Sequence, residues 1–202
     1  GLRGQSGGPL FTSDGVIYGI QSMTNHLHLG FDMVKDADGY RRMAGAMQIL
    51  GRKAGVYGMI GGQTADIEAE DGKSLLTEEV LLFIHENKTA ALIQAAMMIG
   101  AILAGADKDA VASMEKAAYN IGIAFQIQDD ILDVTSTTEV LGKPVGSDEK
   151  NNKLTYVVLH GLEESKKEVE KLSDEALLIL KSFHQRNVFL EELVVSLITR
   201  EK

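Results

Sequence analysis

From about residue 36 onward, apolar residues recur every three or four positions, the spacing that places side chains on one face of an α-helix. The first such face comprises Met43, Met47, Leu50 and Ala54. The pattern predicts helices over residues 38–54, from Ser74 or Thr77 to 104, and over residues 108–134, 153–162, 164–183 and 188–200. A Gly-rich break is expected at Gly58, Gly61 and Gly62, and a polar loop over residues 136–152.

The first 31 residues follow a different pattern. They are rich in glycine, and a turn at Ser13-Asp14-Gly15 precedes the β-like run Val16–Ser22, which predicts a strand after a hairpin turn. We therefore expect a mainly all-α protein with a short β-hairpin-like N-terminal appendage. The predicted division places the Gly-rich segment at residues 1–33 and the helical domain at residues 34–202.

Composition supports helix packing and narrows the function. The chain has no Trp and no Cys, so a thiolate metal site and disulfides are excluded. The net charge is −9, and the sequence shows no cluster of basic residues of the kind that binds nucleic acid. Residues 89–106 are uncharged and nearly long enough to cross a bilayer, but they are rich in Ala and Gly. We expect a buried core helix there and no membrane span.

Three carboxylates, Asp129, Asp130 and Asp133, form the pattern D-D-x-x-D at the end of a predicted helix. The three like charges repel one another. Their neighbours are apolar, which raises the energy of the charged groups further. A hard cation such as Mg²⁺ would relieve both effects, because it binds carboxylate and phosphate oxygens. An exposed acidic helix end is the alternative that this triplet alone leaves open.

Neighbouring polar residues favour the metal-diphosphate interpretation. Gln126 lies one helical turn before Asp129, and Lys143 and Lys153 follow in the polar loop and just after it. Lys88 and Thr89 lie where the apolar stretch begins. Ammonium groups beside a metal-bound diphosphate would stabilise its negative charge. Taken singly, Lys143 and Lys153 are better explained as surface charges, and Lys88 is explained equally well as a cap on the core.

Four blocks occur in order: GMIGGQTADIEAE (58–70), HENKTAALIQAA (85–96), IGIAFQIQDDILDVT (121–135) and LGKPVGSDEKNNKLTY (141–156). Together they resemble successive signatures of the polyprenyl synthetase family, over roughly residues 38–202. The resemblance implies the C-terminal half of an isoprenoid synthase helical bundle. It also implies an isoprenyl diphosphate synthase, which condenses an allylic diphosphate with isopentenyl diphosphate, with Mg²⁺ as cofactor, a homodimer in the intact family and a cytoplasmic location.

The same resemblance implies roles for individual residues. Asp129 and Asp130 would face the metal. Asp133 would either bind the metal directly or support the residues that bind it. Lys88, Lys143 and Lys153 would contact the allylic diphosphate. Thr89 and Gln126 would line the reacting end of the allylic substrate, near the carbocation. Together with Lys88 they form the expected catalytic set. Gln63 and Asp66 are weaker candidates for the cavity wall.

The sequence carries only the second of the two Asp-rich motifs that the family uses, since Asp36 and Asp38 match neither. The family's Gly- and Arg-rich isopentenyl diphosphate segment is also absent. We therefore expect this polypeptide alone to have little or no synthase activity, and the first motif's absence leaves product chain length open. An alternative is a non-catalytic helical fragment that retains weak Mg-diphosphate binding.

A second resemblance concerns the N-terminal segment. GLRGQSGGPLF (1–11), followed by DGVIYGIQS (14–22), is similar to the nucleophile region of chymotrypsin-like serine proteases, in which Ser6 would be the nucleophile. A simple Gly-rich turn is the other interpretation. A serine protease remnant fused near residues 32–38 to a helical tail is thus a third functional hypothesis, and without a positioned base Ser6 would be a weak nucleophile.

Overall fold

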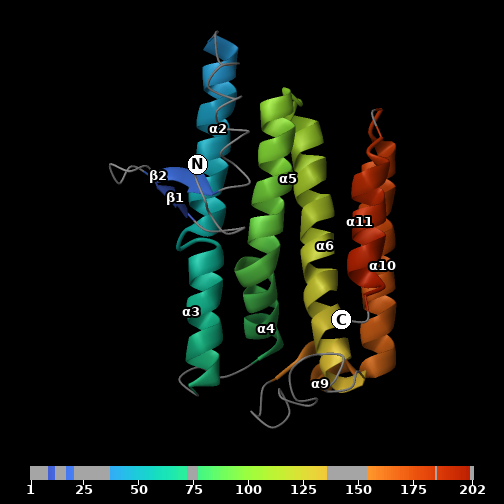
Figure 1. The fold of residues 1–202 in the computed structure, drawn as a ribbon. Helices are drawn as coiled ribbons and strands as arrows, with labels where there is room; N and C mark the ends of the chain where they lie inside the picture. Colours follow the sequence, from blue (N-terminus) through green and yellow to red (C-terminus); the bar gives the residue numbers. More distant parts are fainter. Residues whose placement is uncertain are drawn as a thin grey trace. The chain divides into compact units, whose positions relative to one another are not determined.

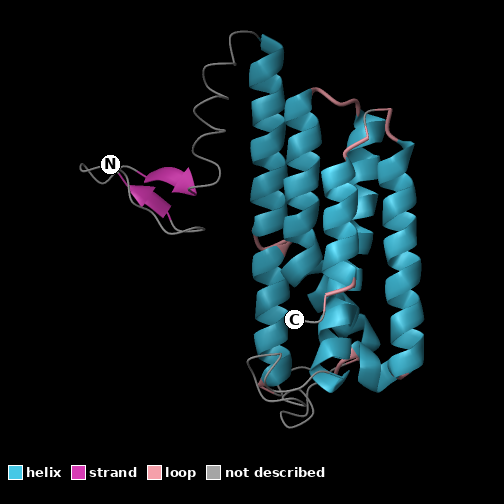
Figure 2. Ribbon diagram, turned by 45° about the vertical axis from the view of Figure 1, so that its right-hand side comes forward, coloured by secondary structure: helices cyan, strands magenta, loops and turns pink. Residues whose placement is uncertain are grey.

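The computed structural model describes residues 37–71, 77–135, 154–184 and 186–200, together with the backbone of two short strands. These strands, β1 (Pro9–Phe11) and β2 (Ile17–Ile20), pair antiparallel, with Pro9 opposite Ile20. They are the magenta arrows of Figure 2. The strand predicted within Val16–Ser22 corresponds to β2, and the predicted turn at Ser13-Asp14-Gly15 lies outside the described residues.

Helices make up nearly all of the remaining described chain (Figure 1). They are α2 (Ala37–Ala54), α3 (Met59–Glu70), α4 (Glu78–Ile84), the π-helical turn η1 (His85–Ala90), α5 (Ala91–Ala104), α6 (Lys108–Thr135), α9 (Tyr156–His160), α10 (Leu162–Ser182) and α11 (Val188–Ile198). The predicted mainly all-α fold is confirmed. The chain divides into two compact units, Gly1–Ala44 and Gly45–Lys202, and the features below belong to the second.

The break expected after the first helix is present at residues 55–58 and includes Gly58, but its extension to Gly61 and Gly62 is wrong, because α3 begins at Met59 and runs through both glycines. Gly62 serves packing instead of chain reversal. A Cβ on Gly62 would lie 2.2 Å from the backbone nitrogen of Lys88 in η1. Because glycine has no side chain, α3 and η1 approach more closely here than they could with any other residue at position 62.

The predicted helix from Thr77 to residue 104 is confirmed as α4, η1 and α5 in direct succession. Thr77 caps its start by accepting a hydrogen bond from the Val80 backbone N–H. Gly105 ends it in the left-handed conformation with φ of 83°, which glycine adopts without strain. The one departure from a regular α-helix is the π-helical turn in the middle.

The helix α6 is central to the second unit. It packs against α5 and η1 on one side and against α10, α11 and α9 elsewhere (Figure 1). Its buried positions are small or branched, among them Ala117, Ala118, Ala124 and Ile127, which are 0% exposed. Burying Ile127 fully contributes roughly 1.5–3 kcal/mol to folding. Small residues on α6 therefore set the short distances between neighbouring helices.

The apolar stretch that passes through α5 is buried on one face only. Ala91, Ala95 and Met98 are buried, whereas Leu92 and Leu103 are exposed. Within the described ranges, one helical stretch, residues 78–104, is long and apolar enough to cross a membrane, a property that core helices of soluble proteins share. The predicted core helix is thus present, but it is not enclosed on all sides.

A polar contact joins three helices beside this apolar layer. Lys53 at the end of α2 donates from Nζ to Gln94 Oε1 of α5 and to Glu115 Oε1 of α6, both at 2.7 Å. Gln94 is only 4% exposed, so its side-chain amide depends on this partner for a hydrogen bond. The lysine therefore satisfies a buried polar group and neutralises a carboxylate at the same point.

Candidate functional site

The three aspartates of the D-D-x-x-D pattern occupy the end of α6 but differ in exposure. The side chain of Asp129 is 49% exposed and that of Asp130 is 14% exposed. Asp133 is almost completely buried, with 2% exposure. Within the described residues, no three His, Cys, Asp or Glu side chains converge as a metal-binding group. The structure therefore leaves Asp129 half-exposed, keeps Asp130 mostly buried and holds Asp133 in the interior.

Two other segments hold Asp130. Its Oδ2 accepts a hydrogen bond of 2.8 Å from the backbone N–H of Tyr156, the first residue of α9. The same oxygen lies 3.9 Å from Nε2 of the buried His85 in η1. A carboxylate at a helix N-terminus is stabilised by the positive end of the helix dipole. Asp130 is thus fixed in place between α9 and η1.

Asp129 has partners of a different kind. Gln126, three residues earlier on α6, donates from Nε2 to Asp129 Oδ2 at 3.4 Å, a long hydrogen bond. The guanidinium of Arg200 donates to Asp129 Oδ1. The structure thereby brings Gln126 next to the carboxylate, as the sequence spacing predicts, and adds a cation from beyond α11.

Lys88 and Thr89 lie in η1, and two glycines fix the position of this turn. Gly62 of α3 approaches it from one side, and Gly122 of α6 lies so close that a Cβ there would be 2.4 Å from Ala90 Cβ. Single π-helical turns inside α-helices occur frequently at functional sites. Here the turn places His85 beside Asp130 and carries Lys88 and Thr89 on the same short segment.

Lys88 pairs with a carboxylate from α3. Its Nζ donates to Asp66 Oδ2 at 2.5 Å, where the lysine side chain is 33% exposed and that of Asp66 is 6% exposed. Lys88 thus has a buried carboxylate partner, and part of its own side chain is exposed to solvent. Thr89 and Gln63 are half-buried. Of Gln63 and Asp66, the two weaker candidates for the cavity wall, Asp66 is the one that contacts a predicted site residue, Lys88.

The remaining predicted residues fall elsewhere in the chain. Lys143 and Lys153 lie outside the described residues, as does Ser6 in the N-terminal segment. Their predicted roles stay predictions.

Three contributors to the site were not anticipated from sequence: His85, the backbone N–H of Tyr156, and Arg200. His85 stands three residues before Lys88 in a block singled out by resemblance, which was an available signal. Arg200 lies 71 residues from Asp129, and no sequence pattern connects them. Burial raises the pKa of the Tyr156 phenol, and nearby carboxylates, first Glu168, raise it further, so the phenol stays neutral beside the site.

Comparisons with known proteins agree with this arrangement. The model of the polyprenyl synthetase family matches residues 16–192. The farnesyl diphosphate synthase of Escherichia coli is 40% identical over 183 residues, which cover 86% of this chain and 60% of the relative. The geranylgeranyl diphosphate synthase of Cyanophora paradoxa is 50% identical over 119 residues, which cover 59% of this chain and 39% of that protein. The chain therefore spans less than two thirds of each relative.

A solved structure shows the same fold. The geranyltransferase of Helicobacter pylori, crystallised with magnesium and isoprenyl diphosphate, superposes with a TM-score of 0.64 and 29% identity. The match covers 88% of this chain and 57% of that one. The family model accounts for most of the sequence and includes the strand at Ile17–Ile20 and the helices from α2 through the start of α11. The chain belongs to the polyprenyl synthetase family.

Proposed function

We propose that this chain provides the allylic-diphosphate half of an isoprenyl diphosphate synthase, a prenyltransferase that joins an allylic diphosphate to isopentenyl diphosphate. The observation that carries the proposal is the pair of partly exposed carboxylates at the end of α6. They stand beside the π-helical turn that bears the Lys88 cation. Relatives named farnesyl and geranylgeranyl diphosphate synthases support the reaction class.

The donor set fits Mg²⁺. This cation usually takes one or two carboxylates and completes its shell with water and phosphate oxygens. Asp129 supplies a half-exposed carboxylate and Asp130 a mostly buried one, which is already oriented by the Tyr156 N–H. We assign these two as ligands and Asp133 as a buried support behind them. When bound, the cation would neutralise the diphosphate and so make it a better leaving group.

The chain's own side chains would bind and orient the substrate. Lys88, held by Asp66, would contact the allylic diphosphate through its ammonium group. Lys143 and Lys153 are proposed as further diphosphate contacts. Thr89 and Gln126 would line the reacting end, where their dipoles stabilise developing positive charge. Fixed polar groups of this kind lower the barrier because they need no reorganisation during the reaction.

Within these 202 residues a single Asp-rich motif is present. We propose that the polypeptide by itself turns over slowly or not at all, and that it binds Mg-diphosphate as a helical fragment when its second wall is missing. A cytoplasmic location and a homodimer in the intact protein belong to the same proposal.

A synthase assay tests the proposal directly. Purified polypeptide is incubated with Mg²⁺, isopentenyl diphosphate and dimethylallyl diphosphate, and prenyl products are extracted and quantified. We expect little or no product. Clear product that disappears in Asp129→Ala would confirm the prenyltransferase and overturn the proposed impairment. Product that persists in Asp129→Ala would contradict the assignment of the site.

The serine protease hypothesis rests only on the residues around Ser6. The relatives reported above give it no support, and the family match begins at residue 16, within the segment that suggested it. An active-site serine reagent such as a fluorophosphonate decides the matter. Labelling of Ser6 that is lost in Ser6→Ala would support the serine protease hypothesis. Absence of labelling would contradict that hypothesis and would not affect the prenyltransferase proposal.

A further inference from the structure

We propose that Arg200 is an additional residue of the metal site, a counterion that occupies Asp129 in the absence of the cation and competes with it. This inference rests on the proposed function, because it takes Asp129 as a metal ligand. It concerns a residue that lies in none of the four sequence blocks and that reaches α6 from beyond the end of α11.

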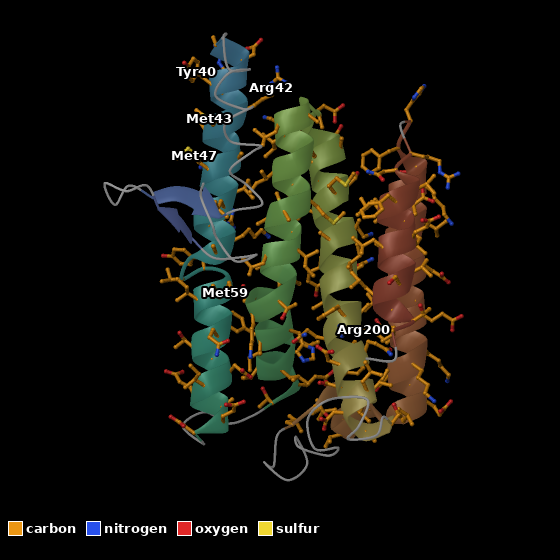
Figure 3. All side chains as sticks on the ribbon, viewed as in Figure 1. Tyr40, Arg42, Met43, Met47, Met59 and Arg200 are labelled. Atoms are coloured by element: carbon orange, nitrogen blue, oxygen red, sulfur yellow. The ribbon has the colours of Figure 1, made fainter. Side chains whose placement is uncertain are left out.

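Three contacts hold the Arg200 guanidinium against one turn of α6. Nη2 donates to Asp129 Oδ1 and to the backbone carbonyl of Phe125, the latter at 3.3 Å. The guanidinium carbon lies 3.7 Å from the centroid of the Phe125 ring, a cation–π arrangement. Figure 3 shows Arg200 beside α6, where its side chain is 19% exposed. A stacked, largely buried arginine is far better defined than an ordinary surface ion pair.

The contact places a positive group on the oxygen that a metal would use. The guanidinium balances the negative charge of the Asp129 carboxylate when no cation is present. Mg²⁺ binds carboxylate oxygens directly at about 2 Å. A divalent cation on Asp129 would then lie within a few ångströms of a second positive charge, so Mg²⁺ binding must displace Arg200 or be weakened by it.

The resting position of Arg200 is suited to release. Its Nε is buried and makes no hydrogen bond with the described part of the chain. A buried donor left unsatisfied reduces the stability of the arrangement that contains it. Arg200 also follows the last helical residue, Ile198, by two positions, so its displacement requires no break within α11.

Mg²⁺ affinity of the metal-free polypeptide tests the competition, with MgCl₂ as the titrant in isothermal calorimetry. Arg200→Gln should raise the Mg²⁺ affinity roughly fivefold, the ratio expected when one partly exposed ion pair no longer opposes binding. Arg186→Gln is the matched control, because it removes the Arg186–Glu191 ion pair at the opposite end of α11 and leaves Asp129 untouched. Equal or weaker Mg²⁺ binding in Arg200→Gln would overturn the proposal.

A second measurement needs no metal. In EDTA, the unfolding midpoints of Arg200→Gln, Asp129→Asn and the double variant form a thermodynamic cycle. We expect clearly non-additive shifts, whereas additive shifts would show that the pair does not form and would sink the proposal. The two levels of inference also separate. If Asp129→Asn abolishes Mg²⁺ binding but Arg200→Gln leaves it unchanged, only the counterion role fails. If Mg²⁺ binding is absent or indifferent to Asp129→Asn, the metal site itself fails and Arg200 with it.

Discussion

Gly122 lies where α6 meets η1, and replacing it with alanine tests whether close helix approach builds the site. A Cβ at this position would lie 2.4 Å from Ala90 Cβ and 2.5 Å from Ala90 Cα. Ala90 is 0% exposed, and its Cα and Cβ cannot rotate away. The two helical segments must therefore separate by about 1 Å to restore ordinary van der Waals contact.

Two opposing free energies decide the outcome. Alanine improves helix propensity over glycine by up to about 1 kcal/mol. Overpacking a well-filled core typically costs about 1–3 kcal/mol, and contact with backbone atoms favours the upper end of that range. We expect Gly122→Ala to lower the free energy of unfolding by about 1–2 kcal/mol. Because η1 carries Lys88 and Thr89, the same displacement should weaken diphosphate binding.

Urea unfolding followed by circular dichroism measures the effect, with Gly100→Ala as the matched control. Gly100 is also inside a helix, α5, but no atom from a neighbouring element lies within 4 Å of its added Cβ. The control should therefore gain up to about 1 kcal/mol from helix propensity alone. Opposite signs for the two substitutions are the predicted result. A Gly122→Ala protein as stable as the parent would refute the argument that contact at this crossing is tight.

Three other predictions concern the surrounding scaffold. Lys53→Met should lower the free energy of unfolding by about 1–3 kcal/mol in urea titrations, because it leaves a buried amide without its donor, whereas Lys167→Met at an exposed pair should change it by less than about 0.5 kcal/mol. Arg186 donates to Glu191 and holds the pKa of that carboxyl below its ordinary value of 4.5. The ion pair therefore stabilises the fold fully above pH 4.5, and this stabilisation is lost as the pH falls through the lowered pKa. Arg186→Gln should flatten this part of the stability–pH profile, and an unchanged profile would contradict the pairing. Asn187 caps α11 by accepting from a backbone N–H, so Asn187→Ala should cost about 1 kcal/mol, measured by thermal unfolding, and no change would show the cap to be unimportant.

Helix periodicity and turn residues were sufficient to predict most of the helices, because the spacing of apolar residues follows from which faces are buried. They failed at α3, where Gly61 and Gly62 suggested a break. Gly62 is required by an approach to η1, a neighbour that local sequence does not reveal. Glycine thus indicates backbone proximity as readily as chain reversal, and only the tertiary contact distinguishes the two.

The candidate site divides in the same way. The grouping of Gln126 with Asp129 follows from helix geometry, so spacing along α6 was enough to predict it. The different exposures of Asp129 and Asp133 did not follow, although they are four residues apart, because exposure depends on what packs around the end of α6. Arg200 could not be predicted at all, since its contact with Asp129 is made by folding across 71 residues.

Mg²⁺-dependent binding of inorganic pyrophosphate is the most direct test of the claim that the end of α6 holds a metal-bound diphosphate. Asp129→Asn and Asp130→Asn remove charge but keep an oxygen that can accept the existing hydrogen bonds. Asp109→Asn removes the same charge about 30 Å away at the other end of α6, given a rise of about 1.5 Å per residue. We predict that the parent and Asp109→Asn bind pyrophosphate only with Mg²⁺ and that both site variants lose this binding. Equal Mg²⁺-dependent binding by all four proteins would contradict the account.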